Sequence, residues 1–243
     1  MFDRLFDPIL ATLYPQMCHV CQGPVESHSD GVACAECWSA TRIFDGSEVL
    51  CQKCGAVSKD GRLNRENRCG QCEDGLYDRA VACGVYEKAL AATVVNLKKK
   101  PYLPRRADRI LISLIGRLSS DTNSVVVPVP LSKKRRFERG HNQADVIGQT
   151  IAALAGIQLV TNGLRRIDSS PIHRVGMDKK AREATVKNSF VVSTPRLIDG
   201  RDVLLVDDVF TSGSTASYCA KALKKSGAAS VEVITLARAV MYK

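Results

Sequence analysis

Two adjacent acids and a run of hydroxyl-bearing residues stand close together near the end of the chain. Asp207 and Asp208 are followed by a loop made of Thr211, Ser212, Gly213, Ser214 and Thr215. The hydroxyls, the flexible glycine and the backbone N–H groups of such a loop can surround an anion, above all where a helix begins. The carboxylates can accept hydrogen bonds from sugar hydroxyls. Together the two features predict a site for a phosphorylated sugar.

The flanking elements would place this site at the edge of a sheet. Residues 203–206 form a short, continuously apolar run, as expected for a parallel strand buried on both faces. A helix with apolar residues at Ala216, Ala220 and Leu223 is expected after the loop. Open α/β sheets bind ligands at the carboxyl ends of their strands, and the two acids stand at such an end.

Two other interpretations of the acid pair fit the sequence less well. A response-regulator receiver domain also has acids after a strand, but only 35 of the 243 residues follow Asp208, too few for its remaining strand–helix pairs. An ordinary strand-to-helix turn explains the glycine and the hydroxyls but not two adjacent acids. The sequence has no G-x-x-x-x-G-K-[ST] segment, so it does not predict a nucleotide-triphosphate loop.

Eight of the ten cysteines form four Cys-x-x-Cys knuckles in the first third of the chain. The knuckles are Cys18 with Cys21, Cys34 with Cys37, Cys51 with Cys54, and Cys69 with Cys72. Two knuckles that fold back on each other can complete one tetrahedral Zn²⁺ site without an open position. We therefore expect two structural zinc ions, each held by consecutive knuckles. The spacing also allows the first knuckle to pair with the third.

Other uses of these cysteines and of their neighbours are less favoured. Redox chemistry does not suit four knuckles in series outside any βαβ pattern. In a reducing compartment, zinc binding is favoured over disulfides. His19 and His28 could each replace a cysteine ligand but are expected at the surface, and the remaining Cys83 and Cys219 are expected in the core.

A strongly basic segment follows the strand expected at residues 125–130. It reads Lys133, Lys134, Arg135, Arg136, Phe137, Glu138, Arg139, Gly140, His141, Asn142 and Gln143. A charge run is commonly just a solvated face. If both strands are parallel, however, this segment shares a rim with the acid pair. We therefore expect Arg135 and Arg136 to help bind pyrophosphate.

From residue 77 the pattern is that of an α/β domain. Strands are expected at 80–86, 125–130, 190–192, 203–206 and 231–236, and helices at 89–97, 106–118 and 144–154. Residues 164–188 form a long, polar and basic segment, and loops of such length are usually functional or disordered. We expect two parts: residues 1–76, an amino-terminal helix and a double zinc-ribbon module, and residues 77–243, a mostly parallel sheet flanked by helices.

The net charge of +10 is unevenly distributed. Residues 1–76 hold seven Lys/Arg and eleven Asp/Glu, formally −4, so the rest of the chain is formally +14. Eight thiolates with two Zn²⁺ would take the first part to about −8. A polyanion is therefore expected to bind residues 77–243.

The amino-terminal residues do not predict a targeting or membrane segment. No stretch approaches the roughly 18 apolar residues of a membrane span, and Asp3 and Asp7 do not fit a secretory signal. We expect a cytoplasmic protein with no membrane span. Apolar residues recur at helical spacing over residues 2–13, and docking onto the body is the expected use. A single basic residue, Arg4, argues against binding to a membrane surface.

These motifs carry a family resemblance. The segment VLLVDDVFTSGST resembles the phosphoribosyl-pyrophosphate motif of type I phosphoribosyltransferases. Together with the four knuckles and VPVPL followed by R-G-x-N-Q, in this order, the chain resembles the ComF/GntX family over nearly its full length. That resemblance implies a phosphoribosyltransferase-like fold, a bacterial role in competence and the use of external DNA, and contact with single-stranded DNA. A competence helicase or another DNA-uptake protein is the implied partner.

The resemblance also implies roles for individual residues. Asp207 and Asp208 would hold the ribose hydroxyls and help place Mg²⁺, and residues 211–215 would hold the 5′-phosphate. The implied pyrophosphate side is made of Arg139, Gly140, Asn142 and Gln143, with Arg182 in a mobile loop. The sequence departs from the family at His141, where an aromatic such as Phe is usual, and in the loop near Arg174 and at Thr185.

Three hypotheses about function follow. The first is a ComF-like protein that handles incoming single-stranded DNA through a domain that binds phosphoribosyl pyrophosphate, with the zinc ribbons docking a partner. The second is a catalytically active phosphoribosyltransferase of nucleobase or nucleotide salvage, with Asp207 and Asp208 at its centre. The third is a zinc-organised scaffold with a vestigial site, which the intact acid pair disfavours.

Overall fold

The structure is a computed structural model that describes residues 11–240 except 12, 28, 58–67, 70, 71, 73, 117, 119–121 and 168–188. Its helices are α2 (Ala35–Ser39), α3 (Lys88–Leu97), α4 (Arg105–Ile115), α5 (Lys133–Arg139), α6 (Gln143–Ala155), the 3₁₀ helix η2 (Pro195–Leu197) and α8 (Ser214–Lys225). Its strands are β1 (Arg79–Ala82), β2 (Ser124–Pro128), β3 (Gln158–Leu159), β4 (Leu164–Arg166), β5 (Phe190–Val192), β6 (Asp202–Phe210) and β7 (Ser230–Arg238).

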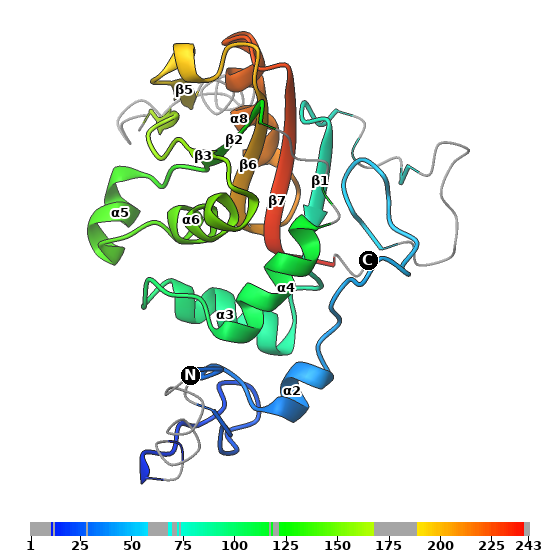
Figure 1. The fold of residues 1–243 in the computed structure, drawn as a ribbon, viewed down its shortest axis with the longest axis vertical. Helices are drawn as coiled ribbons and strands as arrows, with labels where there is room; N and C mark the ends of the chain where they lie inside the picture. Colours follow the sequence, from blue (N-terminus) through cyan, green and yellow to red (C-terminus); the bar gives the residue numbers. More distant parts are fainter. Residues whose placement is uncertain are drawn as a thin grey trace, which may run out of the picture.

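Five parallel strands form the main sheet, in the order β1-β7-β6-β2-β3 (Figure 1). The middle strand, β6, pairs with β7 on one side and with β2 on the other. Both of its faces are covered, which is why Val203 to Val206 are apolar without alternation. Parallel strands need crossover connections, and α6 and α8 lie in those connections.

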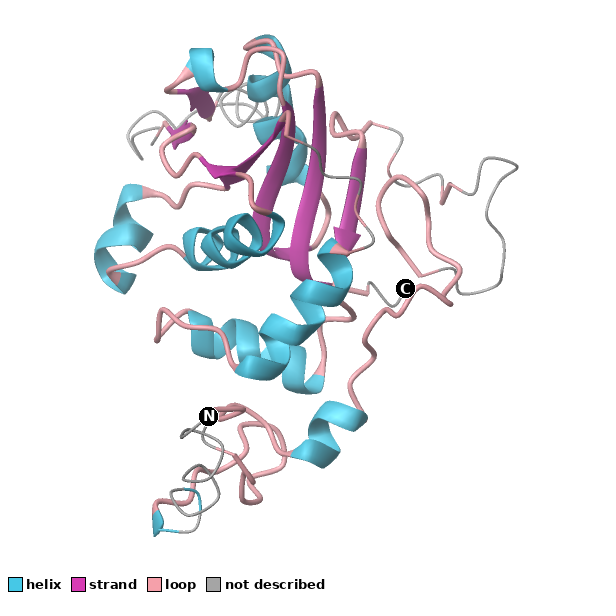
Figure 2. Ribbon diagram, viewed as in Figure 1, coloured by secondary structure: helices cyan, strands magenta, loops and turns pink. Residues whose placement is uncertain are grey.

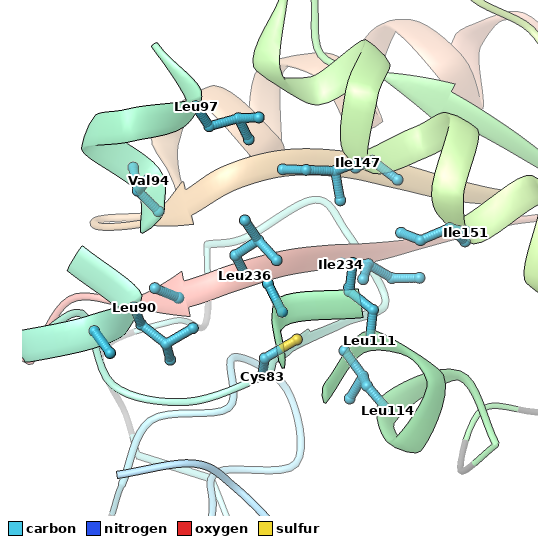
Figure 3. Packing of buried hydrophobic residues seen from close by; sticks show 14 of the residues in the cluster. Cys83, Leu90, Val94, Leu97, Leu111, Leu114, Ile147, Ile151, Ile234 and Leu236 are labelled. Atoms are coloured by element: carbon cyan, nitrogen blue, oxygen red, sulfur yellow. The ribbon is translucent and has the colours of Figure 1, made fainter. Parts of the chain in front are cut away.

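Helices cover the two faces of the sheet and divide its core in two. One cluster joins α3, α4 and α6 to alternate residues of β6 and β7, among them Leu204 and Ile234 (Figure 3). The other joins α8 to the intervening residues, among them Val203 and Leu205. Successive residues of a strand point to opposite faces, so one strand contributes to both clusters.

The cysteine-rich part lies outside these layers, mostly as loops with the short helix α2 (Figure 2). The first ribbon packs on α3 and α4: Cys34 and Trp38 share a cluster with Leu90, and Arg106 forms an ion pair with Asp30 at 3.2 Å. The second ribbon packs beside β1 and α8. These contacts cross residue 76, and the division into units at that residue stays a prediction.

Several element boundaries differ from those expected from the sequence. The strand expected at 80–86 is interrupted after Ala82: Gly84 bridges to Ile43 of the cysteine-rich part, and Val85 then pairs again with Arg238 of β7. The first residues of the long loop, Leu164–Arg166, instead form β4, which pairs antiparallel with β5. The rest of that loop at 168–188, and residues 2–10 of the amino-terminal helix, lie outside the described residues.

A search of the described residues finds no helix that is both long and apolar enough to cross a bilayer.

Candidate functional site

The acid pair lies in the second half of β6, because that strand runs on to Phe210 rather than ending at Val206 as the sequence suggested. Asp207 stands opposite Thr235 of β7, and its Oδ1 accepts a hydrogen bond from the backbone N–H of Asp208 at 2.9 Å. Burial, and next the charge of Asp208, raise the pKa of Asp207 to about 7. A carboxyl of this kind changes charge near neutral pH.

The loop after β6 is shaped to receive an anion. Gly213, with φ of +77°, is the N-cap of the twelve-residue helix α8 and has no side chain to accept from the first-turn N–H groups. Except for the Ser214 N–H, which donates to Ser212 Oγ at 3.4 Å, these donors and the positive end of the helix dipole can serve a negatively charged ligand. The hydroxyls of Ser212 and Ser214 lie 3.0 Å apart beside them.

The structure brings the acids and the loop together. A small cavity of about 30 Å³ is lined by Asp207, Thr211, Gly213 and Thr215, with Thr235 of β7. Asp207, Thr211 and Thr215 therefore line one space, which has room for about one water molecule. Binding of a sugar phosphate beside it stays a prediction.

The site lies where the sheet changes direction. After β2 the chain moves outward to β3, whereas after β6 it moves to β7 on the opposite side. Adjacent strands whose connections diverge leave a crevice at their carboxyl ends, and this is the usual ligand site of open α/β sheets. Asp207 and Asp208 lie near the carboxyl end of β6, and the basic segment follows the carboxyl end of the neighbouring strand β2.

The basic segment forms the exposed helix α5, with no buried residue. Ser132 caps its start and Gly140, in the left-handed conformation, ends it. Arg136 forms an ion pair with Asp145 at 3.3 Å. Phe137, between these charges, is 93% exposed. Arg135, Arg136 and Arg139 are thus placed on a helix at the crevice rim.

The three residues after Gly140 lie against the rest of the fold, and two of them, Asn142 and Gln143, are among those predicted to bind ligand. Asn142 is buried, caps α6 through the Ala144 N–H, and donates to the Val129 carbonyl at 3.0 Å. Gln143 is also buried, although its Nε2 has no hydrogen-bond partner among the described residues. The His141 ring lies 2.7 Å from the Leu97 carbonyl and 2.9 Å from that of Arg139, so it links α3 to the end of α5. These residues position the basic helix, while Arg182 lies outside the described residues.

The cysteines form two closed clusters of consecutive knuckles, which confirms the expected pairing and excludes the crossed one. The members are Cys18, Cys21, Cys34 and Cys37 in the first, and Cys51, Cys54, Cys69 and Cys72 in the second. All Sγ atoms of a cluster lie within 4.8 Å of one another. His19 belongs to neither, and His28 lies outside the described residues.

The clusters fit zinc in size and chemistry. A tetrahedron with Zn–S bonds of about 2.3 Å has edges of about 3.8 Å between sulfur atoms. The Sγ atoms of Cys21 and Cys34 are 3.7 Å apart, and those of Cys54 and Cys69 are 3.6 Å apart. Although burial opposes ionisation, backbone hydrogen bonds lower the pKa of Cys18 and of Cys51 to about 6, whereas burial raises that of Cys72 to about 11. Thiolates are the ligands Zn²⁺ requires, so each set can hold one ion with structural chemistry.

Three residues beside the second cluster and the anion loop were missed by sequence reasoning. Arg238, at the end of β7, donates to both the carbonyl oxygen and the Sγ of Cys54. Phe210 and Tyr77 pack edge to face, with ring centroids 5.6 Å apart. Phe210 lies within the segment VLLVDDVFTSGST, but no motif contains Arg238 or Tyr77, whose partners are distant in sequence.

Comparison with known proteins agrees with this arrangement. The double zinc ribbon domain model matches residues 9–73, and the phosphoribosyl transferase domain model matches residues 155–241. The DNA utilization protein YhgH of Escherichia coli (strain K12) is 28% identical over 92% of this chain and 97% of its own length. Competence protein F of Haemophilus influenzae is 29% identical over 91% and 96%, respectively. The chain is thus similar over nearly its full length to proteins named for DNA utilization and for competence.

Other comparisons cover less of this chain. Competence protein ComFC of Bacillus subtilis is 30% identical over 52% of this chain and 49% of its own length. Among solved structures, a glutamine phosphoribosylpyrophosphate amidotransferase of B. subtilis has a TM-score of 0.37 and 18% identity, covering 53% of this chain and 25% of its own. A likeness at that score carries no weight. The expected fold class, a parallel sheet of phosphoribosyltransferase type with helices after a double zinc ribbon, is confirmed.

Proposed function

We propose that this protein binds phosphoribosyl pyrophosphate with Mg²⁺ at the carboxyl end of β6. The observation that carries the proposal is the cavity shared by Asp207 and the loop of Thr211, Gly213 and Thr215. An acid beside an anion-binding loop matches a ligand with hydroxyls at one end and a phosphate at the other. The polar groups of this arrangement do not suit a purely apolar ligand.

Each group of residues would have a separate task. Residues 211–215 would bind the 5′-phosphate through N–H groups and hydroxyls, while Asp207 and Asp208 would accept hydrogen bonds from the ribose. Arg135, Arg136 and Arg139 would face the pyrophosphate from α5. The acids would also hold Mg²⁺, which would supply charge neutralisation of the pyrophosphate when bound.

The same site could support transfer of the phosphoribosyl group. In such a reaction the bond from the anomeric carbon to pyrophosphate breaks, and an acceptor forms the new bond at that carbon. The protein would contribute position and charge stabilisation rather than a covalent group. Release of pyrophosphate in the presence of nucleobases or DNA distinguishes a transferase from a binding protein.

We further propose that the body binds single-stranded DNA through α5. This helix carries Lys133 to Arg136 and an aromatic ring, Phe137, that is 93% exposed. Basic residues bind the phosphate backbone and exposed rings stack on bases. The cluster at Arg105 and Arg106 is less available, because Arg106 is paired with Asp30 of the first ribbon.

The relatives' names give this binding a context. Proteins similar over nearly the whole chain are named for DNA utilization and for competence. We propose that this protein acts in the cytoplasm in the use of external DNA, with the acidic zinc ribbons docking a competence helicase or another DNA-uptake protein.

The ligand proposal is tested by calorimetry with phosphoribosyl pyrophosphate and Mg²⁺. Replacing both acids, Asp207→Ala with Asp208→Ala, should weaken binding at least tenfold. Charge-assisted hydrogen bonds contribute about 1.5–3 kcal/mol each, and about 1.4 kcal/mol is a factor of ten. Asp199→Ala, on a loop away from the crevice, serves as the control. Unchanged affinity in the double variant would remove the ligand assignment.

A further inference from the structure

The two zinc clusters differ in what surrounds them. The first contacts α3 and α4, through the ion pair of Asp30 with Arg106 and the hydrogen bond from the Arg105 N–H to the Ser29 carbonyl. The second touches the end of β7. There Arg238 donates one hydrogen bond to the Cys54 carbonyl oxygen and a second, of 3.4 Å, to its Sγ. Cys54 is 3% exposed, so both contacts are sheltered from water.

The same guanidinium contacts the base of the anion loop. Its Cζ lies 4.7 Å from the ring centroid of Phe210, the last residue of β6. Arg238 and Phe210 also stand opposite each other in the β6–β7 register. A cation over a buried ring is an attractive contact that fixes the ring's place. The guanidinium of Arg238 therefore contacts Cys54 through its N–H groups and the Phe210 ring through its planar face.

Phe210 in turn supports the loop. A Cβ placed on Gly213 would lie 2.7 Å from Cζ of Phe210 and 3.1 Å from the Tyr77 hydroxyl. Glycine is thus required both by its φ of +77° and by the closeness of the two rings. The position of Phe210 decides where the backbone of Gly213, the N-cap of α8, can lie.

The segment that follows the second cluster also contacts Phe210 and the start of α8. Tyr77, five residues beyond Cys72, is 3% exposed and packs edge to face on Phe210. Next to it, the Leu76 N–H donates to Ser217 Oγ at 3.0 Å, in the first turn of α8. Between this segment and the loop lies a cavity of about 460 Å³, lined by Cys72, Tyr77, Ser212 and Gly213 among others.

We propose that the second zinc site positions the anion loop, and that Arg238 is the positioning residue that connects the two. With zinc bound, the tetrahedron fixes Cys54 and Cys72, and through them Arg238, Tyr77 and Phe210 hold Gly213 in the conformation that receives phosphate. Without zinc the knuckles are released and the loop loosens. The first site has no such connection among the described residues. This inference rests on the proposed binding of phosphoribosyl pyrophosphate for its functional consequence, but not for its structural one.

The test compares Arg238→Gln with Arg106→Gln, which breaks the arginine contact of the first ribbon. Two quantities are measured on the full chain: the rate of zinc transfer to a colorimetric chelator, and the affinity for phosphoribosyl pyrophosphate with Mg²⁺. Arg238→Gln should speed the release of one of the two ions at least tenfold, since residues that support metal ligands commonly contribute 10–100-fold in metal affinity. It should also weaken the sugar ligand about tenfold, whereas Arg106→Gln should change that affinity less than twofold.

A third readout separates this inference from the proposed function. Hydrogen exchange of residues 211–217 is followed before and after zinc is removed, with no sugar ligand present. Faster exchange in this loop on zinc loss, and in Arg238→Gln with zinc bound, supports the inference even if the wild-type protein fails to bind phosphoribosyl pyrophosphate. Unchanged exchange overturns it, as does faster zinc release with unchanged loop exchange.

Conservative variants distinguish a loss of these specific contacts from general misfolding of the protein. Arg238→Lys keeps the charge but not the planar fork, and should fall between wild type and Arg238→Gln in both zinc release and loop exchange. Phe210→Leu keeps an apolar side chain but removes the ring, so loop exchange should rise while zinc release stays near wild type. If Phe210→Leu leaves loop exchange unchanged, the path through this ring is wrong.

Discussion

The backbone N–H of Asp208 donates to the Oδ1 of its neighbour Asp207, at 2.9 Å, in the interior of a parallel sheet. This bond favours the charged form of Asp207, but burial and the second carboxylate outweigh it and raise the pKa from 3.8 to about 7. The folded protein therefore holds a proton that the unfolded chain releases near pH 4. Without ligand, protonation of Asp207 avoids the cost of burying its charge. A ligand that requires the ionised carboxylate must supply the free energy to remove this proton.

Stability should accordingly depend on pH through Asp207. Because its pKa is higher in the folded state, the free energy of unfolding is greatest below about pH 4 on this account and declines until about pH 7. Asp207→Asn removes that decline. We expect the variant to exceed wild type by roughly 1–2 kcal/mol at pH 8, allowing for water near a partly buried carboxylate, and to match it near pH 4. Urea unfolding without Mg²⁺ measures this; equal differences at both pH values would contradict it.

Gly213 and Gly156 provide a matched test of the anion loop. Both have positive φ, but a Cβ on Gly156 meets nothing within 4 Å, whereas one on Gly213 meets Phe210 and Tyr77. Gly156→Ala should lower stability by about 1 kcal/mol through backbone strain alone and leave ligand affinity unchanged. Gly213→Ala should lower stability further and reduce affinity for phosphoribosyl pyrophosphate at least tenfold. Similar affinities for the two variants in calorimetry would show that the loop does not bind the phosphate.

Purified protein should contain two zinc ions per chain, because both cysteine clusters have the size and the ligands of closed tetrahedral sites. Elemental analysis measures the content. Cys21→Ser and Cys69→Ser, each at the more exposed side of its cluster, should each reduce it to one. A wild-type content of one or none would contradict the double-ribbon assignment.

The charges of α5 should control the salt dependence of DNA binding. Neutralising Lys133, Lys134, Arg135 and Arg136 together should lower the slope of log affinity against log salt by roughly 0.7 for each DNA phosphate that the variant no longer neutralises. Fluorescence titration with single-stranded DNA at several salt concentrations measures the slope. Arg42→Gln, in the acidic part of the chain and paired with Glu87, is the control and should leave the slope unchanged. A fourfold variant that loses the sugar ligand but keeps its DNA slope would assign these charges to pyrophosphate alone.

Phe137 should contribute to the same binding in a different way. Its ring is 93% exposed on α5, so Phe137→Ala leaves the core intact. Stacking of one base on an aromatic ring contributes about 1–3 kcal/mol, so affinity for single-stranded DNA should fall about fivefold or more with an unchanged salt slope. An unchanged affinity would leave α5 as a purely electrostatic surface.

Local patterns in the sequence determined much of this site. The knuckles lie within four-residue segments, and the acid pair, the hydroxyl loop and the start of α8 lie within fifteen consecutive residues. Backbone conformation over such short distances follows from residue type: an apolar run makes a buried strand, and glycine permits the turn before the helix. The consecutive pairing of knuckles could be expected for the same reason, although only the structure excluded the crossed alternative.

The tertiary structure alone decided which distant residues support the site. Arg238 meets Cys54 across 184 positions of sequence because β1 and β7 are neighbours in the sheet and the second ribbon folds against their edge. Asn142 and Gln143 carry the polar groups of a ligand site but are buried at the start of α6, since the packing of that helix on β2 and β6 covers them. Residue type indicates what a side chain can bind. Strand order and helix packing determine what it meets, and those depend on contacts that no short stretch of sequence contains.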